Sequence, residues 1–241
     1  VGSVNRSGWS GFERKFLAPS VDHPLRFANL QSENLQTSMH HTILIVTGDG
    51  GESYEALYAI HRFAEAGIPA VVAAPRTGRL NLVIHDFEPG WDTYIERPGY
   101  VSEAQITLAD IAVDDYSAIL LLGGRAPEYL RHNARLLEVV RQFDEQGKYI
   151  FALCHGVQIL VTAGLAKDRC LTAYEHVRSE IELGGGTYVA DEQAVRQGRI
   201  VTGQTWQSHP EFYRAVFACL NENGSADAET QAQPLARVLS R

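Results

Sequence analysis

The stretch YIFALCHGVQILVTAGL, residues 149–165, passes from an apolar run into Cys154, His155 and Gly156 and then returns to apolar residues at helical spacing. A continuous apolar run of this kind is typical of a strand that is buried on both faces of a parallel sheet. The stretch therefore predicts a strand, a sharp turn that carries a cysteine, and a helix. Two interpretations of Cys154 are open at this point: a nucleophile, or a small buried structural thiol.

The same alternation of strand and helix extends in both directions from this stretch. Residues 80–100 are polar, aromatic and rich in turn residues, which predicts a hairpin excursion. Repeated β-α units predict a three-layer α/β/α sandwich with a mainly parallel sheet. We expect one domain at 39–222, an N-terminal extension at 1–38, and a polar, partly disordered tail at 223–241. Strands are expected at 42–49, 69–75, 117–124, 148–154, 171–174 and 199–203, and helices at 53–67, 126–147, 156–164 and 209–222.

Composition narrows the range of partners. The chain has 241 residues, a net charge of −8 and no basic cluster, so neither nucleic acid nor an anionic membrane surface is an expected partner. The longest apolar runs fall short of the roughly 18 residues that a membrane-spanning helix needs. Three widely spaced cysteines favour a reducing compartment, and we expect a cytoplasmic protein. The histidines lack metal-ligand spacing and there is no GxGxxG or Walker sequence, so we expect neither a metal nor another cofactor.

Four segments follow predicted strands, where an open parallel sheet binds its ligands. They are GDGGE (48–52), GGRAPE (123–128), CHG (154–156) and GQTWQSHPE (203–211). Their agreement predicts a cleft, with the oxyanion- and substrate-binding residues Gly51, Gly123, Gly124, Trp206 and His209.

Cys154 is expected on the turn between strand and helix, where backbone N–H groups favour a thiolate. His155 can act as acid or base, but adjacency alone does not place its ring beside the sulfur. Glu52 follows the first strand and could hydrogen-bond the thiol, or could simply face the helix dipole. Exposed amides of Gly123 and Gly124 could form half of an oxyanion site, or only a tight turn.

The segment SHPE at 208–211 also has two interpretations. His209 and Glu211 could serve Cys154 as a histidine–glutamate pair. Alternatively, Ser208 and Glu211 form a capping box at the start of the last helix, with Pro210 in its first turn. We favour the capping box for Glu211 and leave His209 open.

Taken together, these segments resemble the ThiJ/PfpI superfamily, which is related to class I glutamine amidotransferase domains. The resemblance covers residues 41–220 and lies in GGRAPEYLR, ALCHGVQILVTAGL, CLTAYEHV, LGGGTYV and SHPEF. With the hairpin at 83–100, it is closest to the subgroup of plant tandem-domain glyoxalases and PfpI-type proteases. The resemblance implies a flavodoxin-like sandwich with Cys154 as the nucleophile.

The resemblance also implies roles for other residues. Glu52 matches the carboxylic acid beside the thiol. His155 matches a histidine that pairs with the cysteine and with a glutamate from a neighbouring subunit, and that glutamate matches Glu128. We therefore expect a homo-oligomer, at least a dimer, whose sites lie near subunit contacts. The 38-residue extension and the glycine-rich GDGGE depart from the family pattern.

The leading hypothesis is cofactor-free chemistry on a small reactive carbonyl, with a hemithioacetal on Cys154, as in glutathione-independent glyoxalases and protein deglycases. The first alternative is a cysteine peptidase with Cys154, His155 and a neighbour's Glu128 as a triad. A redox sensor or chaperone with an oxidisable Cys154 is a further alternative. Two further alternatives are an amidotransferase glutaminase and an enzyme that hydrates isonitriles.

Overall fold

The computed structural model describes residues 42–236, with side chains described as far as Glu222. A seven-stranded sheet forms its centre in the order β10-β11-β7-β6-β1-β2-β5, and every neighbouring pair is parallel except β10 with β11. The expectation of a mainly parallel sheet is confirmed. The strands of this sheet are β1 (Ile43–Val46), β2 (Ala70–Ala74), β5 (Ile106–Thr107), β6 (Ala118–Leu121), β7 (Tyr149–Leu153), β10 (Ala194–Gln197) and β11 (Ile200–Gly203).

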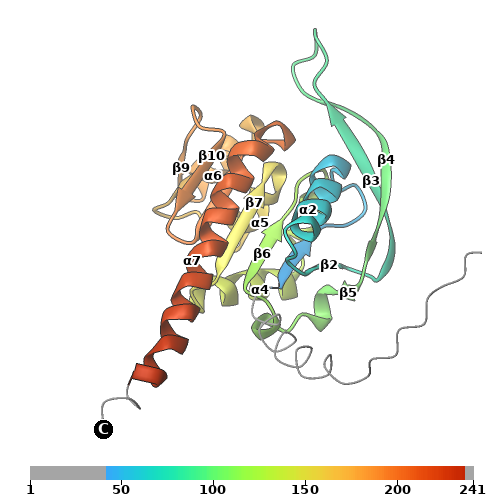
Figure 1. The fold of residues 1–241 in the computed structure, drawn as a ribbon. Coiled ribbons are helices and arrows are strands. Elements are labelled where there is room, and N and C mark those ends of the chain that lie inside the picture. Colours follow the sequence, from blue (N-terminus) through green and yellow to red (C-terminus); the bar gives the residue numbers. More distant parts are fainter. Residues whose placement is uncertain (1–41, 237–241) are drawn as a thin grey trace, which may run out of the picture.

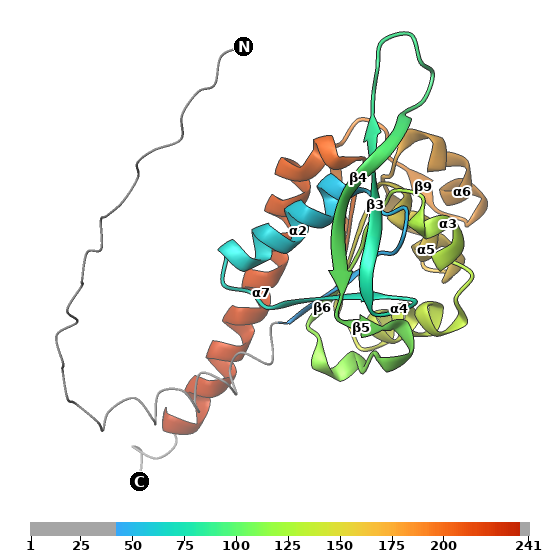
Figure 2. The same ribbon diagram turned by 90° about the vertical axis from the view of Figure 1, so that its right-hand side faces the viewer.

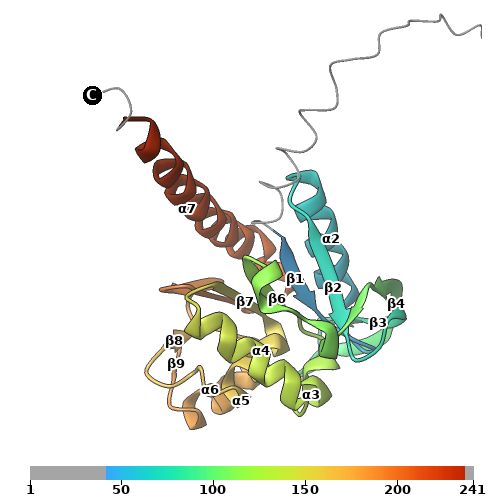
Figure 3. The same ribbon diagram turned by 90° about the horizontal axis from the view of Figure 1, so that it is seen from below.

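Helices cover both faces of the sheet, as a parallel sheet requires. In Figure 3, α2 (Ser53–Glu65) and α7 (His209–Ala236) lie on one side of the strands. The helices of the other side are α3 (Ala126–Leu130), α4 (Ala134–Glu145), α5 (Val157–Thr162) and α6 (Arg178–Leu183). The central strands β1, β6 and β7 are buried along their whole length, because side chains on both of their faces pack under helices (Figure 1). The α/β/α sandwich is therefore confirmed.

The hairpin excursion is also confirmed. β3 (Gly78–Asp86) and β4 (Ile95–Ala104) pair antiparallel and form a separate two-stranded sheet. Figure 2 shows this long hairpin running beside α2, with its tip beyond the end of the central sheet. A bridge between Glu52 and Val83 joins the hairpin to the loop after β1. The hairpin thus brings polar and aromatic residues to the carboxyl ends of the strands.

Three expectations about the secondary structure before the last helix were wrong. The predicted helix at 126–147 is two helices, because Asn133 accepts a hydrogen bond from Leu136 N (3.0 Å) and starts α4 as its N-cap. The strand expected at 171–174 is only β8 (Cys170–Leu171), which pairs with β9 (Thr187–Tyr188) outside the main sheet. The capping box joins Thr205 to Ser208, not Ser208 to Glu211.

The predicted division into an extension, a domain and a tail stays a prediction. The last helix was expected to end at residue 222, but α7 continues to Ala236, into the segment expected to be a partly disordered tail. The predicted extension at 1–38 lies outside the described residues. Within residues 42–236, no helix is both long and apolar enough to cross a membrane.

Candidate active site

The turn between β7 and α5 holds Cys154 in a conformation that L-residues rarely adopt. Its φ is 56°, one of two positive values among the non-glycine residues of the described chain. The turn is a single 3₁₀ turn, Cys154–Gly156, and α5 starts directly after it. A positive φ costs a non-glycine residue of the order of 1 kcal/mol or more and persists where the surroundings enforce it. The strand–cysteine–helix geometry is that of a nucleophile elbow.

Gly156 permits the close contact of this turn with the sheet. Its φ is −55°, so no unusual backbone angle requires a glycine here. A Cβ at this position would lie 2.2 Å from Leu121 O at the end of β6. Gly156 is therefore needed because the elbow packs directly on the neighbouring strand, whereas the unusual angle is at the cysteine.

Glu55 occupies the position beside the thiol that the sequence assigned to Glu52. The Glu55 side chain is fully buried, and its Oε2 accepts a hydrogen bond from Gly123 N (2.6 Å). Burial raises the pKa of Glu55 to about 8, the charge of Glu52 adds to the rise, and hydrogen bonds with Gly123 and Cys154 oppose it. A carboxyl group with this pKa holds its proton at neutral pH and can serve as a general acid.

Glu52 has a different position, as the N-cap of α2. Its Oε2 accepts a hydrogen bond from Glu55 N (2.7 Å), and its side chain is buried. Burial raises its pKa, against hydrogen bonds from the backbone of Glu55, His85 and Tyr54. The expected contact of Glu52 with the thiol is corrected accordingly: the carboxyl that caps the helix and the carboxyl that meets the thiol are one turn apart.

The Cys154 thiol is 6% exposed and its pKa is raised well above the usual value. Burial is the main cause and the charge of Glu55 adds to it, while backbone N–H groups of His155 and Gly124 lower the pKa. The resting sulfur is therefore protonated at neutral pH, contrary to the thiolate expected from the helix terminus. A base must remove this proton when the sulfur reacts.

His155 is in position to be that base. Its Nδ1 lies 3.4 Å from Cys154 Sγ. The sequence could not show whether the ring faces the neighbouring sulfur, and in the structure the two side chains are in contact. Burial lowers the His155 pKa to about 4, which leaves the ring neutral at pH 7. The rings of Tyr94 and Tyr174 flank the imidazole, with centroids 5.7 and 5.1 Å from it. Cys154, Glu55 and His155 thus form one buried group.

The two glycines after β6 serve this group in ways that the sequence did not distinguish. The Gly123 N–H donates to Glu55. It is therefore not free to bind a substrate oxyanion, which is the role that the sequence predicted. The Gly124 N–H lowers the pKa of the Cys154 thiol. Gly124 has a φ of 78°, and a Cβ there would lie 2.3 Å from Glu52 N. The Gly123 amide therefore holds the Glu55 carboxyl in place beside the thiol.

Gly51 and Trp206, both expected to bind substrate, have structural contacts. Gly51 N donates to Gly48 O, and Gly51 O accepts from Val83 N, so both of its backbone groups are occupied. The Trp206 Nε1 donates to His85 O (2.9 Å), which ties the start of α7 to β3. Trp206 lines a cavity between α2 and the hairpin, together with Tyr54 and Tyr100.

His209 does not join the Cys154 group. Its ring stacks on Tyr58 with centroids 4.4 Å apart and meets the edges of Tyr54 and Tyr213. Neither ring nitrogen has a hydrogen-bond partner in the described part of the chain. Glu211 pairs with Arg214 instead of a histidine. The substrate-binding role expected for His209 is therefore replaced by a packing role between α2 and α7.

Glu128 lies in the first turn of α3, where its side chain is exposed. Its charge is close enough to raise the pKa values of Tyr94 and Arg125, so the exposed carboxylate is near the rim of the site. Pairing of Glu128 with His155 of another subunit, as the resemblance implies, stays a prediction.

A histidine that the sequence did not assign to the site also contributes to it. His85 is buried, and its Nε2 lies 3.0 Å from Glu96 Oε2, which also accepts a hydrogen bond from Arg125 Nε (2.6 Å). The His85 ring stacks on Tyr94 at 3.9 Å. This chain of contacts connects the hairpin to the loop after Gly124 and fixes the tyrosine that flanks His155. Among residues 42–236 no cluster of three or more His, Cys, Asp or Glu side chains is arranged to hold a metal ion.

Comparison with known proteins identifies the family of the chain. The model of the DJ-1/PfpI family matches residues 41–218, and the chain belongs to that family. The chain is 37% identical to Protein DJ-1 homolog D of Arabidopsis thaliana over 190 residues, which are 76% of this chain and 49% of that protein. It is 31% identical to Deglycase PfpI of Pyrococcus furiosus over 162 residues, 67% of this chain and 89% of the relative. The chain spans about half the length of the two plant homologues it matches.

Solved structures show the same fold. A ThiJ/PfpI domain protein from Brachyspira murdochii matches with a TM-score of 0.65 at 19% identity, over 75% of this chain and 96% of that one. A two-domain protein with DJ-1/ThiJ/PfpI-like and ferritin-like domains from Anabaena variabilis matches with a TM-score of 0.64 at 23% identity, over 76% and 48% of the two chains.

Proposed function

We propose that this chain is a cofactor-free, cysteine-dependent enzyme that acts on small reactive carbonyls, with the activity of a deglycase or a glutathione-independent glyoxalase. One observation carries the proposal: the Cys154 thiol has a neutral imidazole on one side and a buried carboxylic acid, with a pKa raised to about 8, on the other. An addition to a carbonyl needs a base at the nucleophile and an acid at the oxygen, and this group supplies both. Relatives named deglycases, from Pyrococcus furiosus and Escherichia coli, support the same class of activity.

In the proposed reaction, the Cys154 sulfur bonds to the aldehyde carbon of a 2-oxoaldehyde while His155 Nδ1 takes the thiol proton. The Glu55 carboxylic acid gives its proton to the aldehyde oxygen, and a hemithioacetal forms. The Glu55 carboxylate then removes the C1 hydrogen as a proton, and the C1–H electron pair becomes the C1=C2 bond as the His155 imidazolium protonates the C2 oxygen. The product is an enediol bonded to sulfur.

The second half of the reaction reverses these proton transfers. Glu55 protonates C2, His155 accepts the proton of the C1 hydroxyl, and the enediol becomes a thioester of a 2-hydroxy acid. Water hydrolyses the thioester to the 2-hydroxy acid and the thiol, and the proton carried by His155 returns to Glu55, so the group regains its starting protonation. The sum is one 2-oxoaldehyde plus one water giving one 2-hydroxy acid, so no oxidant or reductant is consumed. Methylglyoxal gives lactate and glyoxal gives glycolate.

The test is lactate release from methylglyoxal without glutathione. Cys170 is a free, exposed cysteine and provides a matched control for the buried Cys154. The proposal predicts that Cys154→Ser loses turnover by at least about 10³-fold, whereas Cys170→Ser keeps the wild-type rate. Equal rates in wild type and Cys154→Ser would overturn the proposal.

The contact between Cys154 and His155 also favours a peptidase as the second candidate, because a cysteine peptidase needs a histidine on its sulfur. This candidate requires a partner subunit to bring Glu128 to His155, and we propose an oligomer on the same ground. Cleavage of fluorogenic peptides, with loss in Glu128→Ala and on dilution to monomer, would favour the peptidase. Turnover of methylglyoxal by a monomer that cuts no peptide would exclude it.

A further inference from the structure

A second cavity adjoins the Cys154 group and is much larger than a three-carbon carbonyl requires. Its volume is about 670 Å³, within the range of small-molecule sites, and Tyr174 is part of its wall. The Tyr174 ring lies 5.1 Å from the His155 ring, so this part of the cavity wall is next to the catalytic imidazole. Since a water molecule occupies about 30 Å³ in the liquid, the cavity has room for roughly twenty of them.

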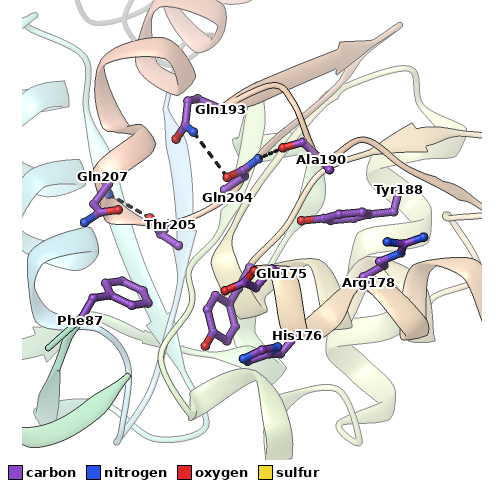
Figure 4. A pocket seen from close by; sticks show the side chains of 11 residues that line it. Phe87, Glu175, His176, Arg178, Tyr188, Ala190, Gln193, Gln204, Thr205 and Gln207 are labelled. Carbon is purple, nitrogen blue, oxygen red and sulfur yellow. Dashed lines mark hydrogen bonds between the residues drawn. The ribbon is translucent and has the colours of Figure 1, made fainter. Parts of the chain in front are cut away.

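The cavity combines aromatic faces with polar side chains. Figure 4 shows Phe87 at one end and Tyr188 and Arg178 at the other, with Glu175 and His176 between them. The side-chain amides of Gln193, Gln204 and Gln207 belong to the same wall. Gln204 Nε2 is anchored on Ala190 O (2.8 Å) and Glu192 O (2.9 Å). The amide groups are therefore held in place by the loops on either side of β10 and β11.

The charges of the wall select the kind of ligand. Arg178 and Glu175 both line the cavity, and the Arg178 guanidinium is paired with Glu182 (2.8 Å). A phosphate or another strong anion would meet Glu175 and would find the cation already paired. Gln204 uses its amide N–H groups on Ala190 and Glu192, and Gln193 Oε1 accepts from Ser208 Oγ (2.7 Å). A purely apolar ligand would cover the hydrogen-bonding positions that these amides have left, together with the Glu175 carboxylate. Hydroxyl groups both donate and accept, as amide side chains do, and aliphatic C–H groups pack on aromatic faces.

We propose that this cavity binds the polyhydroxylated tail of a sugar-derived 2-oxoaldehyde whose aldehyde carbon lies at Cys154. The inference rests on the proposed function and specifies its substrate class. In a six-carbon 2-oxoaldehyde, the four carbons beyond the dicarbonyl extend roughly 5 Å, at about 1.5 Å per bond before bond angles shorten it. That length is comparable to the separation of the His155 and Tyr174 rings. Methylglyoxal has no such tail and leaves the cavity to water.

The kinetic test compares glucosone, a six-carbon 2-oxoaldehyde with four hydroxyl groups, with methylglyoxal. Tyr188→Ala and the exposed Gln207→Ala each remove one wall side chain, and the second variant tests the inference even if the first is unstable. We expect the ratio of kcat/KM for glucosone to kcat/KM for methylglyoxal to fall about tenfold in each variant. The control is Tyr100→Ala, because Tyr100 is exposed, aromatic and outside this cavity. The control should keep the wild-type ratio, and an unchanged ratio in both wall variants would overturn the inference.

A binding test separates failure of the inference from failure of the proposed function. Saturation-transfer NMR with sorbitol, an unreactive six-carbon polyol, on the Cys154→Ser protein requires no chemistry. We expect a signal that Tyr188→Ala or Gln207→Ala reduces and Tyr100→Ala does not. No sorbitol signal in an enzyme that converts methylglyoxal would overturn the inference alone. A sorbitol signal in a protein that converts neither aldehyde would overturn the proposed function and keep the cavity as a polyol site.

Discussion

The end of β7 and the start of α7 each bury a histidine, and burial lowers the pKa of both His155 and His209 to about 4. Their neighbours differ. His155 Nδ1 contacts a sulfur at 3.4 Å, whereas His209 lies among tyrosine rings and neither of its nitrogens has a partner in the described part of the chain. A lowered pKa alone therefore does not identify a catalytic histidine. The atoms that face the ring nitrogens distinguish the two sites.

Two glutamates one helical turn apart show the same contrast. Glu52 and Glu55 are both buried and both have raised pKa values. Glu52 accepts from the backbone of its own helix, while Glu55 reaches across to Gly123 and the thiol. The Glu52 carboxyl caps α2, whereas the Glu55 carboxyl belongs to the Cys154 group.

The largest expected difference concerns the two histidines. His155→Phe should reduce turnover of methylglyoxal by about 10²- to 10³-fold, because the thiol loses its base. His209→Phe should keep turnover within about twofold, since phenylalanine retains the stacking on Tyr58. Steady-state kinetics at pH 7 on both variants measures this contrast. Equal losses in the two variants would contradict it.

The second largest difference in turnover is expected between variants of Glu55 and Glu52. Glu55→Gln keeps the shape of the side chain but removes its proton, and we expect turnover to fall about 10²-fold. In the wild type, turnover should also decline as the pH rises through about 8, where Glu55 loses its proton. Glu52→Gln weakens a helix cap and should lower the free energy of unfolding by about 1 kcal/mol, with turnover reduced less than about tenfold. A larger loss of kcat in Glu52→Gln than in Glu55→Gln would mean that Glu52 is the general acid.

Gly156 and Gly67 are glycines for two different reasons, which are close packing at Gly156 and a positive φ at Gly67. Gly156→Ala places a Cβ 2.2 Å from Leu121 O and should lower the free energy of unfolding by about 2–4 kcal/mol. Gly67 has a φ of 70° and no heavy atom near an added Cβ, so Gly67→Ala should cost about 1 kcal/mol. Urea unfolding of both variants checks this order. A milder effect at Gly156 would mean that the elbow can move away from β6.

The last expected effect concerns acid stability at His209. Its pKa is about 4 in the folded chain and near 6.5 when unfolded, so between these values only the unfolded chain binds the proton. The contribution of neutral His209 to the free energy of unfolding is fully present above about pH 6.5 and is lost as the pH falls toward 4. In His209→Phe, the difference in free energy of unfolding between pH 7 and pH 5 should shrink by about 1–2 kcal/mol. Urea titrations at the two pH values measure it, and an unchanged difference would show that His209 takes up its proton in the folded state.

Much of the fold followed from sequence pattern. Apolar runs such as ILIV at 43–46 and YIFAL at 149–153 are strands because both of their faces are buried, and short glycine-ended helices connect them. The break in the predicted helix at 126–147 also had a local signal, because Asn133 is a good N-cap residue. The apolar spacing that continues on both sides of Asn133 concealed this signal.

The site was harder to predict than the fold. Cys154 and His155 were found because they follow a strand, and Glu55 had a readable signal: it lies four residues before Ala59 and eight before Phe63, on the buried face of α2. The choice of Glu52 placed the acid one turn too early. The contacts of His85 with Glu96 and Arg125 depend on how the hairpin folds over the sheet. Local sequence holds no signal for such long-range contacts, and it equally concealed the packing role of His209.

The most direct test of the central claim asks which sulfur carries the substrate carbon. The chain has three free cysteines, of which Cys154 and Cys219 are buried and Cys170 is exposed. Rapid-quench mass spectrometry of peptides, taken during turnover of methylglyoxal, would locate the covalent intermediate. We predict an adduct with the mass of one methylglyoxal on Cys154 that appears before lactate and disappears when the substrate is exhausted. An adduct found only on Cys170, or lactate formation with Cys154 unmodified throughout, would contradict the account.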